Sequence, residues 1–525
     1  MADRRVISAK KTLLYGVLLV IVAMGAYVRL ADAGQRPFWA DEAWVAQAVR
    51  ENSYLELFAQ TELPMPPLYS IAIKLVGELV KPPELGLRLL PLCCSVACVP
   101  LSYVVVRRLR APRTMALVAT ALVAANPLLV GSRDLKQYQI EALLSLTLAW
   151  LVFSYRRKEG ASRWWFLFAP MLLVCLLGPW LGYGFVFPAT AILGVLILLA
   201  PVAGGRRSCL VAGSLGLLVL GVSTLGVLQF VAWKQAAHPA LIDFTENWYI
   251  HPLDLQAWQR AAGYGALTTT MTMVPFEWIS EGGVPWVIVC GVAAPLMWIL
   301  ALVGLRGWPR PGGWEVGIWM LGSWLLMLGA AVAGQYPFAA PRMMAYWALA
   351  MALPLATGLV RLLRGITIVL TRRGGPGMVA SLLLALLAVA HLPWVRAYWV
   401  YQDFPALLET LREQRRPGEI VIAAVMASPS VRYYAEPRDR AIILMPTAAG
   451  TCRVPDLDYN SLVSDSIPYG ATRWWLLTTS RRREQMVLRM LETDLRRRYE
   501  YRLVAEAGEP SLFGLAQLYV VSRRR

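Results

Sequence analysis

The sequence predicts an all-α polytopic membrane protein with about eleven transmembrane helices, followed by a small soluble α/β domain. Of its 525 residues, 57% are hydrophobic and only 16% are charged, and the mean hydropathy is +0.51. The apolar residues form runs long enough to cross a hydrocarbon core of about 30 Å. After Trp394 the composition becomes mixed polar. We therefore expect a transmembrane domain over residues 1–395 and a second domain over residues 396–525.

The apolar runs predict the individual spans in order. We expect spans near residues 12–30, 86–106, 114–130, 140–155, 164–180, 182–200, 208–232, 284–305, 315–333, 342–363 and 376–394. The fifth and sixth runs are separated only by a turn around Gly178, Pro179 and Gly182, so about ten or twelve spans also fit the pattern. No small-residue cleavage motif follows the first run, which favours a retained signal anchor.

Basic residues mark every second connection between the spans and so predict the orientation. The clusters are Arg4, Arg5, Lys10 and Lys11; Arg107, Arg108, Arg110 and Arg113; Arg156, Arg157, Lys158 and Arg163; Arg206 and Arg207; Arg306 and Arg310; and Arg361, Arg364, Arg372 and Arg373. Because cytoplasmic loops are enriched in Lys and Arg, we expect a cytoplasmic N-terminus. The clusters also explain much of the net charge of +18, so nucleic-acid binding is a poor explanation of it.

The other connections then face outward. They are residues 31–85, 131–139, 233–283 and 334–341, together with everything after about residue 395. Within the C-terminal part, short strands are predicted at 419–427, 440–446, 473–479 and 513–522, and an amphipathic helix at 481–500. This pattern indicates an extracytoplasmic α/β domain. Cys452 stands apart from the other six cysteines, which fall inside spans, so no disulfide framework is implied.

Two adjacent carboxylates, Asp41 and Glu42, follow the first span. Ionisable groups at a membrane boundary are costly to desolvate, so their placement suggests a function. The residues after them predict a helix that lies along the interface, with the carboxylates at its N-terminus, where the helix dipole favours negative charge. The alternative is that Asp41 only caps this helix, but capping does not explain a second carboxylate beside it.

Further polar residues gather in the same outer loop and the next one. Pro66 and Pro67 suit the start of another helix, and Tyr69 lies in its first turn. The second outer loop carries a dense polar cluster, namely Arg133, Asp134, Lys136, Gln137, Tyr138 and Glu141. Such a cluster can bind an anion, with positive charge from Arg and Lys and a hydroxyl donor from Tyr. The alternative is a rim of side chains that reach from the membrane surface into water.

A third group of candidate functional residues lies in the outer loop 334–341 and just beyond it. Tyr336 and Arg342 stand at the outer end of a span, and the positive-inside rule does not explain a basic residue there. A phosphate partner explains Arg342, and interfacial anchoring explains it almost as well. In the long outer loop 233–283, His238 and His251 accompany several carboxylates that could hold a divalent metal ion. Their spacing matches no recognised metal motif, so surface-loop residues are the favoured interpretation.

Three segments carry a resemblance to a known family. The first outer loop contains DEAWVAQAVRENSYLELFAQTELPMPPLYSIAIKL, the second continues as SRDLKQYQIEALLSLTLA, and the late span reads YPFAAPRMMAYWALAMALPLATGL. In order and spacing these resemble the motifs of GT-C glycosyltransferases, specifically the bacterial group similar to dolichyl-phosphate-mannose-protein mannosyltransferases (glycosyltransferase family 39). The chain departs from the family at Met65, where a His usually precedes the PPLY motif.

The resemblance implies a GT-C fold and an integral-membrane glycosyltransferase that moves a sugar from a polyprenyl-phosphate donor to a protein, lipid or glycan acceptor outside the membrane. Asp41 matches the family's catalytic Asp, a general base in an inverting displacement, and Glu42 stands beside it in the expected catalytic pair. Such a base takes the proton that the attacking hydroxyl loses, and cations stabilise the leaving phosphate. The donor phosphate is expected to contact Arg133, Lys136, Tyr138 and Arg342. The substrate pocket is expected to include Asp134, Pro66, Pro67, Tyr69 and Tyr336.

Two other functions fit the number of spans. A transporter or flippase of lipid-linked saccharides usually places functional polar groups near the bilayer midplane, whereas here they gather at the outer boundary and the spans are nearly uncharged. A scaffold that only anchors the outer domain would not need about eleven spans. A glycosyltransferase in a bacterial inner membrane is therefore the favoured prediction, with the site and the C-terminal domain on the periplasmic or extracellular side.

Overall fold

The computed structural model describes most of the chain. The described residues are 2–31, 33–59, 65–131, 135–157, 165–200, 206–232, 249–272, 288–309, 311–336, 341–371, 401–423, 427–436, 442–444, 472–479, 499–509 and 516–523. The predicted span at 376–394 and the expected domain boundary after residue 395 lie outside these residues.

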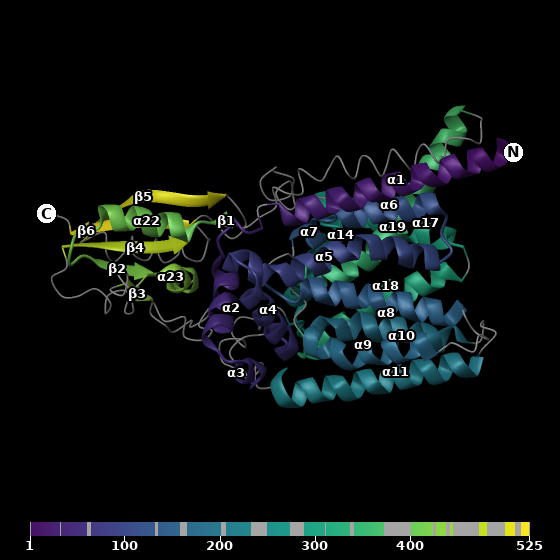
Figure 1. Ribbon diagram of the computed structural model, residues 1–525, viewed down its shortest axis with the longest axis horizontal. Helices are drawn as coiled ribbons and strands as arrows, with labels where there is room; N and C mark the ends of the chain where they lie inside the picture. Colours follow the sequence, from purple (N-terminus) through teal and green to yellow (C-terminus); the bar gives the residue numbers. More distant parts are fainter. Residues whose placement is uncertain are drawn as a thin grey trace.

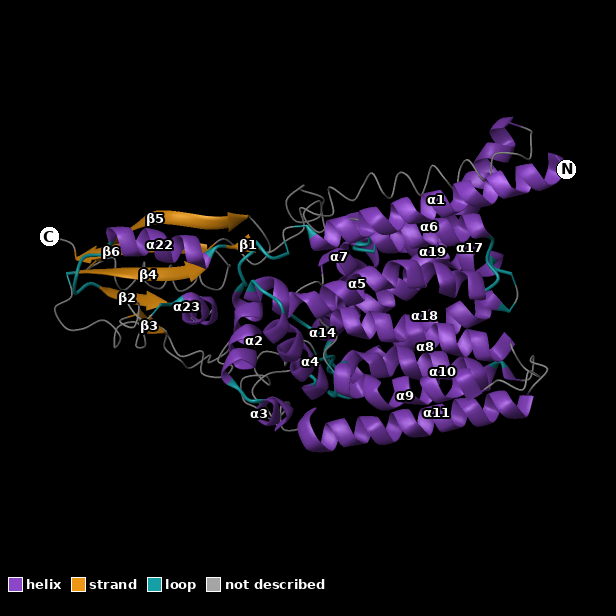
Figure 2. Ribbon diagram, in the orientation of Figure 1, coloured by secondary structure: helices purple, strands orange, loops and turns teal. Residues whose placement is uncertain are grey.

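A bundle of long helices forms one part of the molecule and a mixed β-sheet the other (Figures 1 and 2). The bundle contains α1 (Ala2–Leu30), α5 (Pro83–Arg108), α6 (Arg113–Ala125), α7 (Pro127–Gly131), α8 (Tyr138–Arg157), α9 (Trp165–Leu181), α10 (Val186–Leu198), α11 (Arg206–Val227), α14 (Leu255–Thr270), α17 (Ala294–Gly307), α18 (Gly312–Val332) and α19 (Ala345–Thr371). The N-terminus lies at the end of the bundle that is remote from the sheet (Figure 1).

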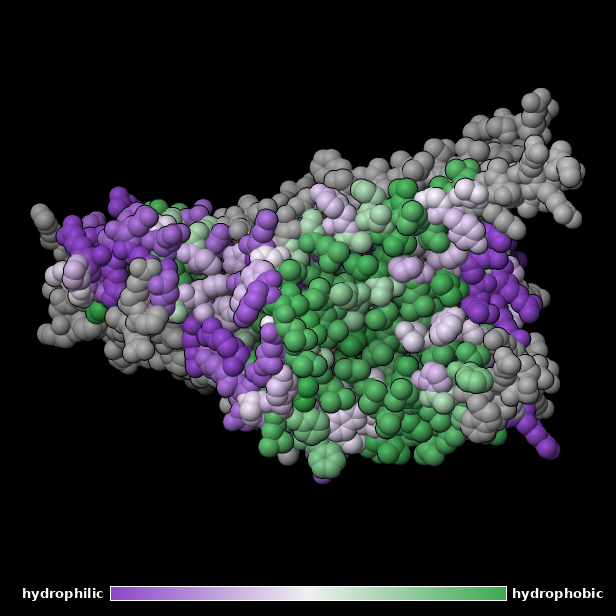
Figure 3. Space-filling model, viewed as in Figure 1, coloured by the Kyte–Doolittle hydropathy of each residue, from purple (hydrophilic) through white to green (hydrophobic). Residues whose placement is uncertain are grey.

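Five of the described helices are long and apolar enough to cross a membrane. They lie at Thr12–Leu30, Pro83–Arg108, Arg207–Ala232, Gly312–Val332 and Ala345–Gly365, and shorter apolar helices accompany them. Hydrophobic side chains cover the visible face of the bundle, and hydrophilic ones appear towards its two ends (Figure 3). An apolar surface of this kind is what a lipid environment requires. The predicted helical membrane protein is therefore confirmed, although the number of about eleven spans stays a prediction.

The helices break where the sequence contains a helix-ending residue. Gly182 separates α9 from the 3-10 turn η1 (Tyr183–Phe185) and α10, as the predicted turn requires. The single predicted run 114–130 is divided into α6 and α7 by Asn126, whose side chain accepts hydrogen bonds from the N–H groups of Leu128 and Leu129. An Asn side chain that binds the backbone in this way starts a new helix at the expense of the old one.

Short helices lie at the end of the bundle that faces the sheet. They are α2 (Ala40–Glu51), α3 (Tyr54–Ala59) and α4 (Pro67–Leu79), all from the predicted first outer loop. The apolar side of α2 packs inward, with Val45 and Val49 buried against α4 and α5. Trp44 is only partly buried, as expected for a helix that lies at an interface.

The opposite end of the bundle is held by buried ionic and polar contacts. Glu315 at the start of α18 pairs with Arg156 and Arg157 at the end of α8. The indole N–H of Trp308, just after α17, donates to the carbonyl of Leu109, just after α5, at 2.9 Å. These contacts bring together the helix ends where the predicted cytoplasmic arginine clusters lie.

The C-terminal part forms a mixed sheet of six strands in the order β1-β5-β6-β4-β2-β3. The strands are β1 (Tyr401–Gln402), β2 (Ile420–Ala423), β3 (Ile442–Leu444), β4 (Arg473–Thr479), β5 (Tyr499–Glu509) and β6 (Ala516–Arg523). The β3-β2-β4 pairs are parallel and the others antiparallel. Two helices accompany the sheet, α22 (Phe404–Gln414) and α23 (Ser428–Tyr434).

The four predicted strands correspond to β2, β3, β4 and β6. Most of the predicted helix at 481–500 lies outside the described residues, but its last two residues, Tyr499 and Glu500, begin β5 and are not helical. The strand β5 pairs with both β1 and β6, so its position in the sheet depends on partners that are distant in the sequence. That dependence explains why local periodicity did not indicate it.

Candidate functional site

The helix α2 carries the two adjacent carboxylates in its first turn. Trp39 is its N-cap residue and makes no side-chain capping bond, so Asp41 does not cap the helix. Asp41 is half-buried, whereas Glu42 is fully buried. The N-terminal turn of a helix favours negative charge, which suits both residues. Their side chains nevertheless have different surroundings.

Glu42 is bound by Arg88 of α5, which lies 46 residues further along the chain. Arg88 Nε donates to Glu42 Oε1 at 2.9 Å, and Arg88 Nη2 donates to Glu42 Oε2. Both side chains are buried, with 1% and 0% exposure. A planar guanidinium that binds both oxygens of a carboxylate fixes its orientation as well as its charge. Arg88 therefore explains the second carboxylate, which capping did not.

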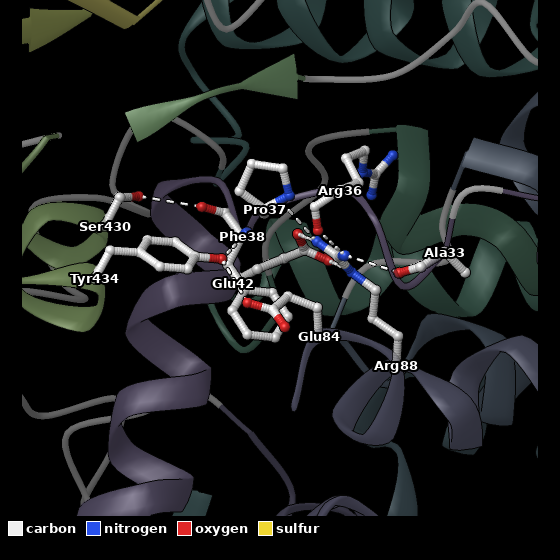
Figure 4. Close-up of polar contacts among 9 residues, drawn as sticks. All are labelled: Ala33, Arg36, Pro37, Phe38, Glu42, Glu84, Arg88, Ser430 and Tyr434. Atoms are coloured by element: carbon white, nitrogen blue, oxygen red, sulfur yellow. Dashed lines mark hydrogen bonds and ion pairs between the residues drawn. The ribbon is translucent and has the colours of Figure 1, made fainter. Parts of the chain in front are cut away.

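The same arginine holds the chain that leads into α2. Its guanidinium donates to the carbonyl oxygens of Ala33, Arg36 and Pro37 at 3.2, 2.6 and 3.0 Å (Figure 4). Its Cζ lies 4.7 Å from the ring centroid of Phe38. The buried Arg88 guanidinium thus contacts three backbone carbonyls, an aromatic ring and a carboxylate. Each of these groups stabilises positive charge away from water.

Phe38 is also bound by α23, which accompanies the C-terminal sheet. The hydroxyl of Tyr434, at the end of α23, accepts from the Phe38 N–H at 2.6 Å and donates to Glu84 Oε1 at 3.3 Å (Figure 4). Ser430 Oγ donates to the Phe38 carbonyl at 3.4 Å. Burial raises the pKa of Tyr434 well above its usual value, so its hydroxyl keeps its proton.

The start of α4 connects the first outer loop to the second. Pro66 is the N-cap residue and Pro67 the first helical residue, as predicted, and both are buried. The Tyr69 hydroxyl donates to the carbonyl of Lys136 at 2.8 Å. Met65 occupies the position of the family's usual His; it is buried, and its carbonyl accepts from the Tyr183 hydroxyl at 3.1 Å. Lys136, which is 8% exposed, is thereby held beside the first loop through its backbone.

The start of α8 meets η1 and the loop that carries Tyr336 around Glu141, in the first turn of α8. Glu141 is fully buried, and its Oε1 accepts from the Gly184 N–H at 2.9 Å. A Cβ on Gly184 would come within 2.7 Å of Glu141 Oε2 and 3.1 Å of the Tyr336 hydroxyl, so only glycine allows this approach. Burial and the neighbouring Glu141 raise the pKa of Tyr336 well above its usual value, which keeps its hydroxyl protonated.

Several predicted site residues have no described side chain. Arg133 and Asp134 lie outside the described residues, as does His238. Arg342 lies in the short 3-10 helix η6 (Pro341–Met344), and nothing is described of its side chain. Tyr138 is described and is 8% exposed, at the first residue of α8. Arg133, Tyr138 and Arg342 stay predictions for the donor phosphate, Asp134 for the substrate pocket and His238 for a metal ion.

The described residues do not form a metal site. Within the part of the chain that the structure describes, no group of three His, Cys, Asp or Glu side chains comes together. His251 is exposed and precedes α14, where its carbonyl accepts from the Asp254 N–H at 3.0 Å. Asp254 in turn caps α14 through the Gln256 N–H at 2.8 Å. The cap accounts for one carboxylate of this loop without a metal ion.

A cavity of about 300 Å³ lies between α14, α17 and α18. It is lined by Trp258, Ala261, Ala262, Gly265, Ala266, Thr269, Ala294, Pro295, Trp298, Trp324 and Leu328. The lining is almost entirely apolar and comes from helices other than those that hold Asp41. Thr268 of α14 contacts Met344 of η6, with Oγ1 and Sδ 3.5 Å apart, so the helix that lines the cavity also packs beside the segment that carries Arg342.

Sequence reasoning missed Arg88 and Tyr434. Arg88 falls inside a predicted span, where a lone arginine is costly unless it is paired, and that cost was the available signal. Tyr434 lies in a short helix that was not predicted, and it meets Phe38 across 396 residues. No local pattern identifies such a partner.

Known proteins resemble this chain in two ways: a family model matches part of its sequence, and solved structures match its fold. Residues 69–227 match the family model described as dolichyl-phosphate-mannose-protein mannosyltransferase. No curated protein matches the chain by sequence. Among solved structures, ArnT from Cupriavidus metallidurans bound to undecaprenyl phosphate has a TM-score of 0.57 at 13% identity, covering 96% of this chain and 98% of that one.

Archaeal enzymes share the same fold. The Archaeoglobus fulgidus oligosaccharyltransferase in complex with Zn and sulfate has a TM-score of 0.55 at 11% identity, covering 95% of this chain and 73% of that one. The oligosaccharyltransferase AglB from the same organism, in complex with an inhibitory peptide and a dolichol-phosphate, has a TM-score of 0.53 at 13% identity, covering 90% and 70%. Likeness at this identity shows the fold. The chain therefore shares the fold of these membrane proteins over nearly its whole length, and its residues 69–227 are similar to the dolichyl-phosphate-mannose-protein mannosyltransferase family.

Proposed function

We propose that the protein transfers a hexose or pentose from a polyprenyl-phosphate donor to an acceptor hydroxyl on the outer face of a bacterial inner membrane, with inversion and with Asp41 as general base. The observation that carries this proposal is the different burial of two neighbouring carboxylates. Both oxygens of Glu42 are bound by Arg88, whereas Asp41 is half-buried at the start of α2. Glu42, first expected to be catalytic, is a positioning residue in this proposal.

The chemistry requires a base and a cationic environment. As the acceptor oxygen bonds to the anomeric carbon, its proton passes to the Asp41 carboxylate, and the bond to the phosphate oxygen breaks with its electrons. The departing polyprenyl phosphate needs positive charge and hydrogen-bond donors. We assign Arg133, Lys136, Tyr138 and Arg342 to this role, and Asp134, Pro66, Pro67, Tyr69 and Tyr336 to the substrate pocket. The bond between Tyr69 and the Lys136 carbonyl supports a shared site for the first two outer loops.

The lipid part of the donor needs an apolar environment. The cavity between α14, α17 and α18 has such a lining, and α14 packs beside the η6 segment that carries Arg342. We therefore place the polyprenyl chain in this cavity and its phosphate near η6. An apolar cavity beside a phosphate ligand suits a lipid phosphate better than a soluble sugar nucleotide.

The transporter alternative is less well supported by the distribution of buried charge. Among the described residues, the buried charged side chains of the bundle are Arg29, Arg88, Glu141, Arg156 and Glu315, and each lies within two turns of a helix end. A transporter usually places such groups near the bilayer midplane, within broken helices. The observed placement favours chemistry at the membrane surface.

The proposal predicts that Asp41→Asn abolishes transfer while the protein still folds. The amide keeps the size of the side chain but cannot accept the proton, so we expect turnover to fall by about 10²–10⁴-fold. Endogenous polyprenyl-phosphate sugars would be followed by mass spectrometry in membranes with matched amounts of folded protein, and the labelled product would identify the acceptor.

Asp403→Asn is a suitable control, because Asp403 caps α22 through the Ala406 N–H and an asparagine can replace that cap. Equal consumption of donor by wild type and Asp41→Asn would show that Asp41 is not the base. If neither protein consumes donor while lipid-linked sugar still crosses the bilayer, the transporter alternative is correct.

A further inference from the structure

We infer that the C-terminal domain positions the start of α2 for catalysis through a single tyrosine, Tyr434. The inference rests on the proposed function, because it concerns the placement of Asp41. Tyr434 does not touch the reacting groups. It holds Phe38, which lies three residues before Asp41, and it acts through that contact.

Both backbone polar groups of Phe38 are bound by α23. The Tyr434 hydroxyl accepts from the Phe38 N–H at 2.6 Å, and Ser430 Oγ donates to the Phe38 carbonyl at 3.4 Å. Phe38 itself is fully buried. A buried N–H that loses its partner costs about 1–3 kcal/mol, which is about a 5- to 150-fold change in an equilibrium. The chain just before α2 therefore depends on a side chain from the C-terminal domain.

The side chain of Phe38 extends the connection into the bundle. Its ring meets Tyr433 of α23 edge to face, with centroids 5.2 Å apart, and lies 4.7 Å from the Arg88 guanidinium on α5. Arg88 continues to Glu42, the neighbour of Asp41. Contacts therefore run without a gap from α23 to the first turn of α2. Figure 4 shows Tyr434, Phe38, Glu42 and Arg88 together with the contacts that join them.

The remaining contacts between α2 and α23 are more exposed. Arg432 pairs with Glu51 at 3.4 Å, with side-chain exposures of 56% and 46%, and such surface pairs contribute little. Arg50 lies 4.6 Å from the Tyr433 ring centroid. These contacts add to the area of the interface, whereas the hydrogen bond from the Phe38 N–H to Tyr434 joins α23 to the buried chain that leads into α2.

Tyr434→Phe tests the inference, because it removes the hydroxyl and keeps the ring. Tyr433→Phe is the matched control: it removes a hydroxyl from the adjacent residue while keeping the ring that packs on Phe38. In full-length protein, hydrogen exchange of the Phe38 amide should become about tenfold faster in Tyr434→Phe and stay unchanged in Tyr433→Phe. Turnover of the endogenous polyprenyl-phosphate sugar should fall by about 10–100-fold in Tyr434→Phe alone, since a small displacement of a catalytic group is costly.

Binding of undecaprenyl phosphate separates positioning from misfolding. We expect its stoichiometry and affinity in Tyr434→Phe to equal those of wild type, since the assigned phosphate ligands lie on other loops. Lost binding would mean a damaged protein and would overturn a specific positioning role. Ser430→Ala, which removes the second bond to Phe38, should change exchange and turnover in the same direction by a smaller factor.

The remaining outcomes distinguish this inference from the proposed function. Unchanged exchange at Phe38 in Tyr434→Phe would overturn the contact, and faster exchange with normal turnover would overturn its role. If Asp41→Asn is inactive while Tyr434→Phe has full activity, the general base stands and the positioning role is wrong. If Asp41→Asn is fully active, the proposed function itself has failed.

Discussion

At the scale of residues, Asp41 and Glu42 differ because successive side chains on a helix point about 100° apart. Glu42 faces α5 and binds Arg88, whereas Asp41 is half-buried. The two neighbouring carboxylates thus differ in exposure, since Glu42 is fully buried against Arg88 and Asp41 is only half-buried. The sequence predicted the pair, but which member is held depends on the position of Arg88.

The Arg88–Glu42 pair should be essential to the stability of this end of the bundle. Arg88→Met leaves a buried carboxylate without its partner, so we expect a loss of about 3–5 kcal/mol. Thermal unfolding in detergent would measure the change, with wild type and variant compared at one pH and lipid content.

A double variant provides the control for that prediction. Glu42→Leu combined with Arg88→Met removes both charges together, so it should recover much of the lost stability. A double variant as unstable as Arg88→Met alone would show that the carbonyl contacts of Arg88, and not its ion pair, stabilise the fold. Activity would report separately on the placement of Asp41.

At the scale of elements, α17 and α19 cross where glycine allows their backbones to meet. A Cβ on Gly304 would come within 1.9 Å of the Pro354 carbonyl oxygen, and a Cβ on Gly358 within 2.0 Å of the Leu300 carbonyl oxygen. Small residues at helix crossings are typical of membrane proteins, because close packing replaces the hydrophobic effect there. This crossing supports α19, whose first residues follow the η6 segment.

Gly358→Ala should therefore destabilise the bundle. The added methyl group must push the two helices apart, with an expected cost of about 1–3 kcal/mol. Gly329→Ala on α18 is the matched control, since nothing lies within 4 Å of its Cβ position. Alanine favours a helix over glycine by about 1 kcal/mol, so the control should be neutral or stabilised. Equal unfolding midpoints for the two variants would contradict a tight crossing.

The sequence predicted those helices and strands whose patterns are local, and it missed those that depend on distant partners. The boundaries of α5, α8, α9 and α18 and the end of α1 follow from apolar length and flanking residues, whereas α1 begins ten residues before the predicted span; four of the strands follow from β-branched and aromatic runs. The strand β5 and the helix α23 were not predicted. The first depends on partners at both of its edges, and the second is a short helix of seven residues that is held by contacts with α2.

At the scale of the whole molecule, the two ends of the bundle have different chemistry. One end is rich in arginine, and there Arg156 and Arg157 form ion pairs with Glu315. The other end carries α2 to α4, with the C-terminal sheet beyond them (Figure 1). By the positive-inside rule we expect the arginine-rich end to be cytoplasmic, and we propose on that basis that Asp41 and the sheet lie outside.

This orientation predicts which positions a membrane-impermeant maleimide reaches. After the seven native cysteines are replaced by alanine, Glu413→Cys on α22 should be labelled in intact cells. Arg207→Cys, at the start of α11, should be labelled only after the cells are permeabilised. Both native residues are exposed, so accessibility within the fold is matched. The reverse labelling pattern would invert the topology and place the proposed site in the cytoplasm.

The sequence by itself determined the helical membrane character, the distribution of positive charge and the presence of two carboxylates beside an apolar helix. These are local properties, since apolar length and loop charge act within one segment of chain. Only the tertiary structure decided that Arg88 binds Glu42, that Tyr69 holds the Lys136 backbone and that Tyr434 binds Phe38. Each of these contacts joins residues that are tens to hundreds of positions apart, and helix and domain packing selects such partners.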